Sequence, residues 1–113
     1  MLSKLKTLDE AKKNHKIGNL DKAIEIYKSI LPKDSANSEI YFLIGTAFLQ
    51  KNDYEKSVYY LKSAIKLKKN VPNYYNNIGI ALTNLNNNKE AIINYNKALK
   101  LNPNSLDTNI NMG

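Results

Sequence analysis

Small residues recur along this chain at a fixed interval, and that interval constrains the fold more than any other feature. Gly45, Gly79 and Gly113 lie 34 positions apart, and Ala11 lies 34 positions before Gly45. A period of this length indicates stacked repeats, each of which forms one supersecondary unit. We therefore expect one domain, divided from Lys4 onward into residues 4–37, 38–71 and 72–105, with part of a fourth unit at 106–113.

Each unit contains the pattern of two helices. At the twentieth position of successive units the side chain is again small, and the twenty-fourth and twenty-seventh positions are mostly apolar, which is the spacing of a buried helical face. These positions hold Ala23, Ser57 and Ala91; Tyr27, Leu61 and Tyr95; and Ile30, Ala64 and Ala98.

Turn-forming pairs divide each unit into two helices. They are Gly18-Asn19, Asn52-Asp53 and Asn86-Asn87, and Asp53 is placed to cap the helix that follows it. The predicted helices run over residues 3–16, 20–31, 37–50, 54–67, 71–85 and 88–101, with a seventh beginning near Ser105.

The residues at positions eight, twenty, twenty-four and twenty-seven, together with Pro103 at the end of the third unit, resemble the tetratricopeptide repeat pattern. The resemblance implies an all-α solenoid of antiparallel helix hairpins in a right-handed superhelical stack, with three repeats and a truncated fourth. It also implies a scaffold that binds a protein or peptide ligand in a concave groove lined by the first helix of each repeat. The chain is further similar to the arrays of O-linked N-acetylglucosamine transferases and of bacterial tetratricopeptide proteins.

The inward positions of the second and third units include Glu39, Gln50 and Thr83 as well as the predicted groove contacts. The predicted contacts are Phe42, Leu43, Thr46, Leu49, Asn73, Asn76, Asn77, Ile80 and Asn84, with Asn111 from the partial fourth unit. Asn77 and Asn111 share the sixth position and resemble the asparagine ladder of the transferase family, which grips a peptide backbone. Chance is an equal explanation of this pair, because asparagine is common throughout the chain.

Another subfamily binds acidic chaperone tails through a two-carboxylate clamp, and its positions are occupied differently here. They hold Leu8, Lys12, Leu43, Asn73 and Asn77, so we do not expect that clamp. The early groove is apolar instead, which predicts hydrophobic anchors followed by amide contacts.

No catalytic residue, cofactor site or metal site is predicted from the sequence. The chain has no cysteine and a single histidine, His15, which we interpret as a polar residue near a helix end. Its net charge of +7 comes from lysine without arginine, so nucleic acid is not an expected partner. We predict that the tyrosines are mainly core residues, with Tyr59 and Tyr74 as exceptions.

No apolar stretch is long enough for membrane insertion, and no secretory signal is recognisable at the N-terminus, so a cytoplasmic location is expected. The outward side of the first helix is polar, as in an end cap, whereas the last unit lacks a polar capping helix. We therefore expect the natural protein to continue. We also expect Leu82 and Ile92 to be exposed at that end, promoting homo-oligomers.

Three functional hypotheses follow from the sequence. The first is the peptide-binding scaffold, which is not an enzyme. The second is the N-terminal recognition arm of a longer enzyme of glycosyltransferase or sulfotransferase type, and the third is self-assembly through the repeat ends.

Overall fold

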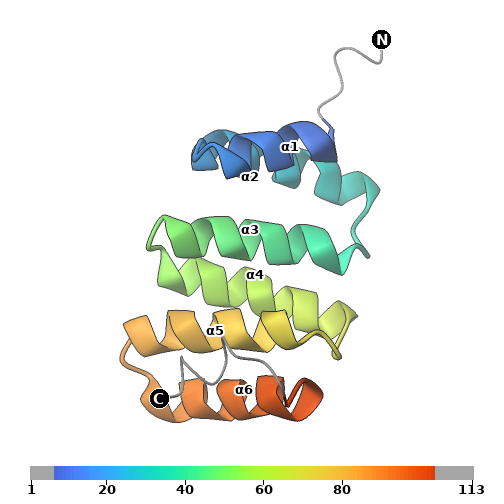
Figure 1. Cartoon of the computed structure of the whole chain (residues 1–113). Helices are drawn as coiled ribbons and strands as arrows, with labels where there is room; N and C mark the ends of the chain where they lie inside the picture. Colours follow the sequence, from blue (N-terminus) through green and yellow to red (C-terminus); the bar gives the residue numbers. More distant parts are fainter. Residues whose placement is uncertain (1–6, 104–113) are drawn as a thin grey trace.

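The computed structural model describes residues 7–103, and within them it places six α-helices in three antiparallel hairpins (Figure 1). The first hairpin is α1 (Leu8–Lys16) and α2 (Leu20–Ile30), followed by the short 3-10 helix η2 (Leu31–Lys33). The second is α3 (Ser38–Gln50) and α4 (Tyr54–Leu67), and the third is α5 (Pro72–Asn84) and α6 (Asn88–Leu101). The all-α hairpin stack is confirmed. The predicted seventh helix, Gly113 and Asn111 lie outside the described residues.

The same backbone turn closes all three hairpins. Gly18, Asn52 and Asn86 have positive φ angles of 88°, 64° and 63°. The amide that follows each of them donates a hydrogen bond to a carbonyl five residues earlier, as in Asp53 N to Phe48 O at 2.9 Å. This geometry matches a Schellman helix end, where glycine or asparagine is preferred because the left-handed conformation disfavours other side chains.

Side-chain caps fix the starts of three helices. Thr7 Oγ1 accepts from the Glu10 amide at 3.0 Å, and Asn37 Oδ1 accepts from the Glu39 amide at 3.0 Å. Asp53 accepts from the Lys56 amide at 3.4 Å, so its predicted capping role is confirmed. Each contact satisfies an amide that the first turn of a helix leaves without an internal partner.

The repeating small residues lie where the two helices of a hairpin cross. A Cβ built on Gly45 would stand 2.7 Å from Leu61 Cγ and 3.2 Å from the Ser57 carbonyl oxygen. A Cβ on Gly79 would stand 2.6 Å from Tyr95 Cδ1. Both distances are shorter than van der Waals contact, so glycine at these positions sets how closely the helices approach.

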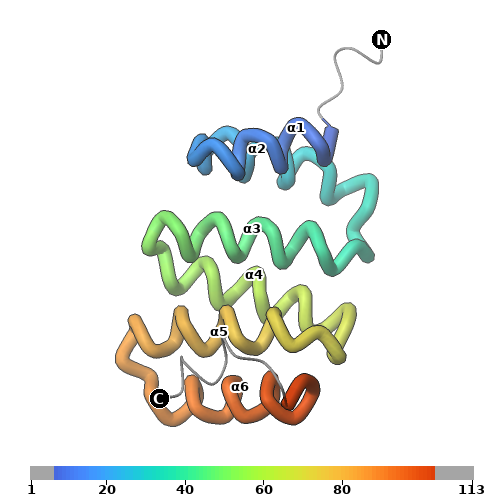
Figure 2. The backbone as a smooth tube through the Cα atoms, in the orientation of Figure 1, coloured from blue at the N-terminus to red at the C-terminus, as the bar shows by residue number. Residues whose placement is uncertain are grey.

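The hairpins stack in chain order into an elongated body with principal extents of 49, 24 and 21 Å (Figure 2). The second helix of each hairpin packs on the first helix of the next, α2 on α3 and α4 on α5. One core cluster spans α1, α2 and α3 and the other spans α4, α5 and α6. Ser38 and Tyr74 join the second and third units through their hydroxyls, which lie 3.0 Å apart in the interior.

Two sequence-based predictions of exposure are wrong. Tyr74 is buried because it packs between units and bonds Ser38, whereas Tyr59 is exposed as predicted. Leu82 is also buried, because it packs in one cluster with Ala91 and Tyr95 of α6. Ile92 is exposed as predicted, and Ile93 beside it is 65% exposed.

Candidate functional site

The structure distributes the predicted groove residues over different environments. Side chains that are half-buried or exposed are Phe42, Leu43, Thr46, Leu49, Asn73, Asn77, Ile80 and Asn84. Asn76 is buried, with 7% of its surface exposed. Asn111 lies outside the described residues.

Several groove residues also support the fold. The Phe42 ring lies 5.0 Å from the Tyr74 ring and packs against the second core cluster, and Ile80 packs on the same cluster. Thr46 Oγ1 donates to the Phe42 carbonyl at 2.8 Å, and Asn84 Nδ2 donates to the Ile80 carbonyl at 2.9 Å. Substitution of Phe42 therefore changes stability as well as the surface of the groove.

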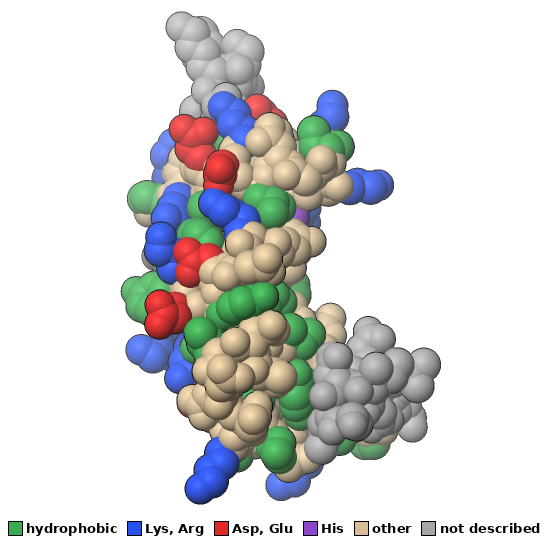
Figure 3. Space-filling view, turned by 90° about the vertical axis from the view of Figure 1, so that its left-hand side faces the viewer, with side chains coloured by type: hydrophobic (Ala, Val, Ile, Leu, Met, Phe, Trp, Pro, Cys, Tyr) green, Lys and Arg blue, Asp and Glu red, His purple; other side chains and the backbone are tan. Residues whose placement is uncertain are grey.

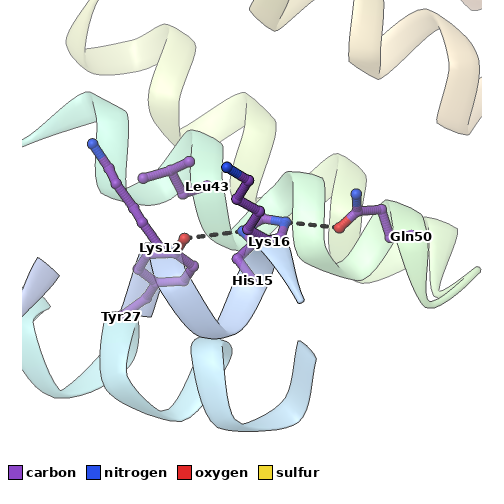
Figure 4. Close-up of a pocket in the computed structure, with 6 residues that line it drawn as sticks. All are labelled: Lys12, His15, Lys16, Tyr27, Leu43 and Gln50. Atoms are coloured by element: carbon purple, nitrogen blue, oxygen red, sulfur yellow. Dashed lines mark hydrogen bonds between the residues drawn. The ribbon is translucent and has the colours of Figure 1, made fainter. Parts of the chain in front are cut away.

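A cavity of about 280 Å³ opens between the first two hairpins (Figure 4). It is lined by side chains from α1, α2 and α3, namely Lys12, His15, Lys16, Tyr27, Leu43 and Gln50. All except Tyr27 belong to first helices and occupy repeat positions six, nine, twelve or thirteen, which the repeat pattern predicts to face the groove. Leu43 and Gln50 are both at predicted groove positions of the second unit, and Leu43 is also a predicted contact residue.

A hydrogen-bonded chain crosses the cavity. His15 Nδ1 lies 2.9 Å from the Tyr27 hydroxyl, and His15 Nε2 lies 2.7 Å from Gln50 Oε1. Because the Gln50 carbonyl oxygen can only accept, His15 Nε2 is the donor of that bond. The imidazole therefore joins the first hairpin to the second.

The interpretation of His15 as a simple helix-end residue missed this contact, although a signal was present. His15 and Tyr27 occupy positions twelve and twenty-four of the first unit. Thr83 and Tyr95 occupy the same positions of the third, and their hydroxyls lie 3.4 Å apart. A polar residue at position twelve thus meets the hydroxyl of a tyrosine at position twenty-four.

Burial raises the pKa of Tyr27 to about 12, and the negative charge of Glu39 adds to the effect. Both causes disfavour the phenolate. At neutral pH the hydroxyl is therefore protonated and available to donate to His15.

Among the described residues, two ion pairs join the first unit to the second, and one of them involves Lys12 of the cavity lining. Lys12 Nζ lies 3.3 Å from Glu39 Oε2, and Lys51 pairs with Asp21. Lys16 has no acidic partner within residues 7–103. The cavity therefore presents one paired and one unpaired ammonium group.

A second polar cluster, in which lysines lie over aromatic rings, joins α2, α3 and α4. Phe48 stacks on Tyr60 with 5.6 Å between ring centroids, and Lys28 Nζ lies 5.6 Å from the Phe48 centroid. Lys56 Nζ lies 5.5 Å from the same ring.

Figure 3 shows lysines and carboxylates interspersed along one edge of the molecule, which is typical of a solvated charged surface.

Residues 7–103 contain no cluster of side chains suited to a metal ion, and no helix among them is long and apolar enough to span a bilayer.

Comparison with known proteins identifies the class. A family model described as "Tetratricopeptide repeat" matches residues 72–105, and one described as "TPR repeat" matches residues 45–85. Together they extend from residue 45 to residue 105. The chain belongs to the tetratricopeptide repeat family.

Curated relatives are peroxisomal targeting signal receptors from yeasts. The receptor of Saccharomyces cerevisiae is 32% identical over 74 residues, which are 66% of this chain and 12% of that protein. The Kluyveromyces lactis receptor is 26% identical over 119 aligned positions, covering 98% of this chain and 20% of that protein. The chain thus spans a fifth or less of the length of these relatives, which are named as receptors rather than enzymes.

Solved structures with the same fold include MamA, with a TM-score of 0.89 and 23% identity over 93% of this chain and 61% of that one. The first repeat domain of Spaghetti (RPAP3), bound to an HSP90 peptide, has a TM-score of 0.88 and 24% identity, covering 94% and 82%. The second repeat domain of human RPAP3, in complex with an HSP70 peptide, has a TM-score of 0.89 and 25% identity, covering 92% and 87%.

Proposed function

We propose that this chain is a protein-interaction module that binds a peptide in the groove lined by α1, α3 and α5. One observation supports this more than any other: the cavity between the first two hairpins opens at the inward positions of the first helices. Concave surfaces of stacked helical repeats bind extended segments of partner proteins. The two RPAP3 domains, which share this fold, are peptide complexes.

The groove offers two kinds of contact in succession. Leu43 and Leu49 on α3 provide half-buried apolar surface. Asn73, Asn77 and Asn84 on α5 provide half-buried or exposed amides. An amide both donates and accepts, so it can pair with a peptide backbone of any sequence. We therefore propose apolar anchors at α3 and backbone recognition at α5, with Asn77 and Asn111 as the ladder.

The proposed role is binding without catalysis, and it accords with the receptor names of the yeast relatives. A recognition arm of a longer enzyme would use the same groove for the same binding step. We propose a cytoplasmic location, and repeat boundaries at residues 4–37, 38–71 and 72–105.

A matched pair of asparagine substitutions tests the groove. Peptides that bind the purified chain are selected from a random display library, and their affinities are measured by fluorescence polarisation. We expect Asn77→Ala to weaken binding about five-fold, since one lost hydrogen bond corresponds to about 1 kcal/mol. Asn96→Ala removes the same group from an exposed position on α6 and should leave affinity unchanged. Equal affinities of the two variants would refute the groove assignment.

A further inference from the structure

The positive charge of the chain is concentrated in its second half. Residues 7–53 contain seven lysines and seven acidic residues, so their formal charges cancel. Residues 54–103 contain eight lysines and two glutamates, which gives a net charge of +6. None of these charged residues belongs to α5. The excess therefore lies on α4, on α6 and on the segment that joins α4 to α5, and such an asymmetry between halves indicates an anionic partner.

Exposed apolar side chains lie on the same two helices, at matching repeat positions. They are Tyr59 and Leu67 on α4 and Ile93 and Leu101 on α6, with exposed fractions of 66%, 45%, 65% and 37%. Positions twenty-two and thirty hold these residues, and the first unit has exposed Glu25 and Lys33 there. Because both positions face solvent in every unit, the exposure of Ile93 and Leu101 does not come from the open end of the stack.

A lysine stands beside each exposed leucine. Lys66 precedes Leu67, and Lys100 precedes Leu101 one repeat later. Positions 59, 66 and 67 have the i, i+7, i+8 spacing of one helical face, and so do positions 93, 100 and 101. Lys66 and Lys100 are exposed and have no acidic partner among residues 7–103. Each helix therefore presents a solvent-facing stripe of apolar groups and an unpaired ammonium group.

Folding explains part of these stripes only. Lys66 and Lys100 lie in the last turns of α4 and α6, where the helix dipole favours a cation. Leu67 and Leu101, by contrast, belong to neither core cluster. Polar residues occupy the same positions in the first unit, so the fold does not require apolar ones. Exposed apolar groups surrounded by polar residues mark interaction surfaces.

Lysines and aliphatic side chains in one stripe suit the surface of an anionic bilayer. Ammonium groups are attracted to acidic lipid headgroups, while aliphatic and tyrosine side chains lie at the boundary between headgroups and acyl chains. Nucleic acid suits the stripes less well, because bases stack on aromatic rings and on guanidinium groups. Ile93, Leu67 and Leu101 offer no ring, and the chain has no arginine.

We infer that the stripes of α4 and α6 dock on an anionic membrane surface. Lys66 and Lys100 contact the headgroups, and the four apolar side chains reach the acyl boundary. In Figure 3 the carboxylates gather in the upper part of the molecule and lysines extend to its lower end, where α6 lies. Second helices form this surface, so it is separate from the groove of the first helices and goes beyond the proposed peptide binding.

Sedimentation with lipid vesicles tests the docking. The purified chain is mixed with vesicles of equal parts phosphatidylserine and phosphatidylcholine, or with vesicles of phosphatidylcholine alone. We expect it to bind the anionic vesicles, less so as salt is added, and to bind the neutral ones weakly. Replacement of Lys66 and Lys100 by glutamine should lower the membrane partition coefficient about five-fold for each lysine removed.

The first unit supplies matched controls for charge and for apolar surface. Lys13→Gln with Lys33→Gln removes the same charge from exposed positions there, and it should lower the partition coefficient less than about two-fold because these sites lie away from the stripes. Ile93→Gln should lower it about five-fold. Ile17→Gln, at a residue that is 71% exposed beside the first hairpin turn, should leave it unchanged.

Three results would overturn the inference. The first is equal binding to anionic and neutral vesicles, and the second is a variant of Lys66 and Lys100 that behaves like its control. The third is Ile93→Gln binding as well as the wild type, because charge alone would then attract the chain. A DNA duplex that binds while vesicles do not would assign the lysines to nucleic acid instead. Peptide binding is tested separately by Asn77→Ala, and circular dichroism of each variant confirms that it is folded.

Discussion

Gly79→Leu tests the close approach of α5 and α6. Even the first carbon of the new side chain would lie 2.6 Å from Tyr95 Cδ1, and the Tyr95 ring is buried. Overpacking of this kind costs about 1 to 3 kcal/mol. Replacement of a helical glycine by leucine recovers somewhat under 1 kcal/mol of helix propensity. We expect a net loss of about 1 to 2 kcal/mol in the free energy of unfolding.

Urea denaturation followed by circular dichroism at 222 nm measures this loss. Asn73→Leu on the exposed side of the same helix is the control and should change stability by less than about 0.5 kcal/mol. The double variant Gly79→Leu with Tyr95→Ala should lose less than the sum of the single losses, with a coupling of about 1 kcal/mol, because the clash is removed. If Gly79→Leu is as stable as the wild type with an unchanged m-value, the crossing does not depend on glycine.

Three further predictions concern a titrating group, a turn and a surface. The pKa of Tyr27 is raised from 10 to about 12, so the stabilisation that this shift represents is fully present below pH 10 and is lost as pH rises toward 12. Between pH 10 and 12 the urea midpoint of Tyr27→Phe should therefore fall less than that of the wild type. Asn86→Ala should lower the free energy of unfolding by about 1 kcal/mol because φ is 63° there, whereas Asn86→Gly should not. Ile92 and Ile93 lie exposed on α6, so light scattering should detect self-association that Ile93→Lys reduces; a strict monomer at high concentration would contradict this.

The hairpins could be predicted from the sequence because their determinants are local. A glycine at position eight and a small residue at position twenty predict that two adjacent helices cross closely there. Both Gly45 and Gly79 lie at such crossings. The left-handed turns at Asn52 and Asn86 likewise follow from residues that tolerate that conformation. These features depend on neighbours within about thirty residues, so the repeat pattern contains them.

Contacts between units could not be predicted in the same way. Tyr74 is buried because it packs on Phe42 and its hydroxyl bonds Ser38, both of which belong to the second unit. The prediction that Leu82 is exposed failed because α6 covers it. The bond from His15 to Gln50 joins residues 35 positions apart in two different units, so the pattern within either unit does not predict the pairing.

The pairing of positions twelve and twenty-four links the packing of a hairpin to the polarity of its groove. In the first and third units the tyrosine at position twenty-four belongs to the second helix, and its hydroxyl lies close to the residue at position twelve of the first helix. The pairs are Tyr27 with His15 and Tyr95 with Thr83. In the second unit position twelve is Leu49 and position twenty-four is Leu61, so neither residue contributes a hydroxyl to the groove. Positions twelve and twenty-four together therefore make that level polar in the first and third units and apolar in the second. The chain alternates polar, apolar and polar levels, which is the pattern of contacts that a bound peptide would have to match.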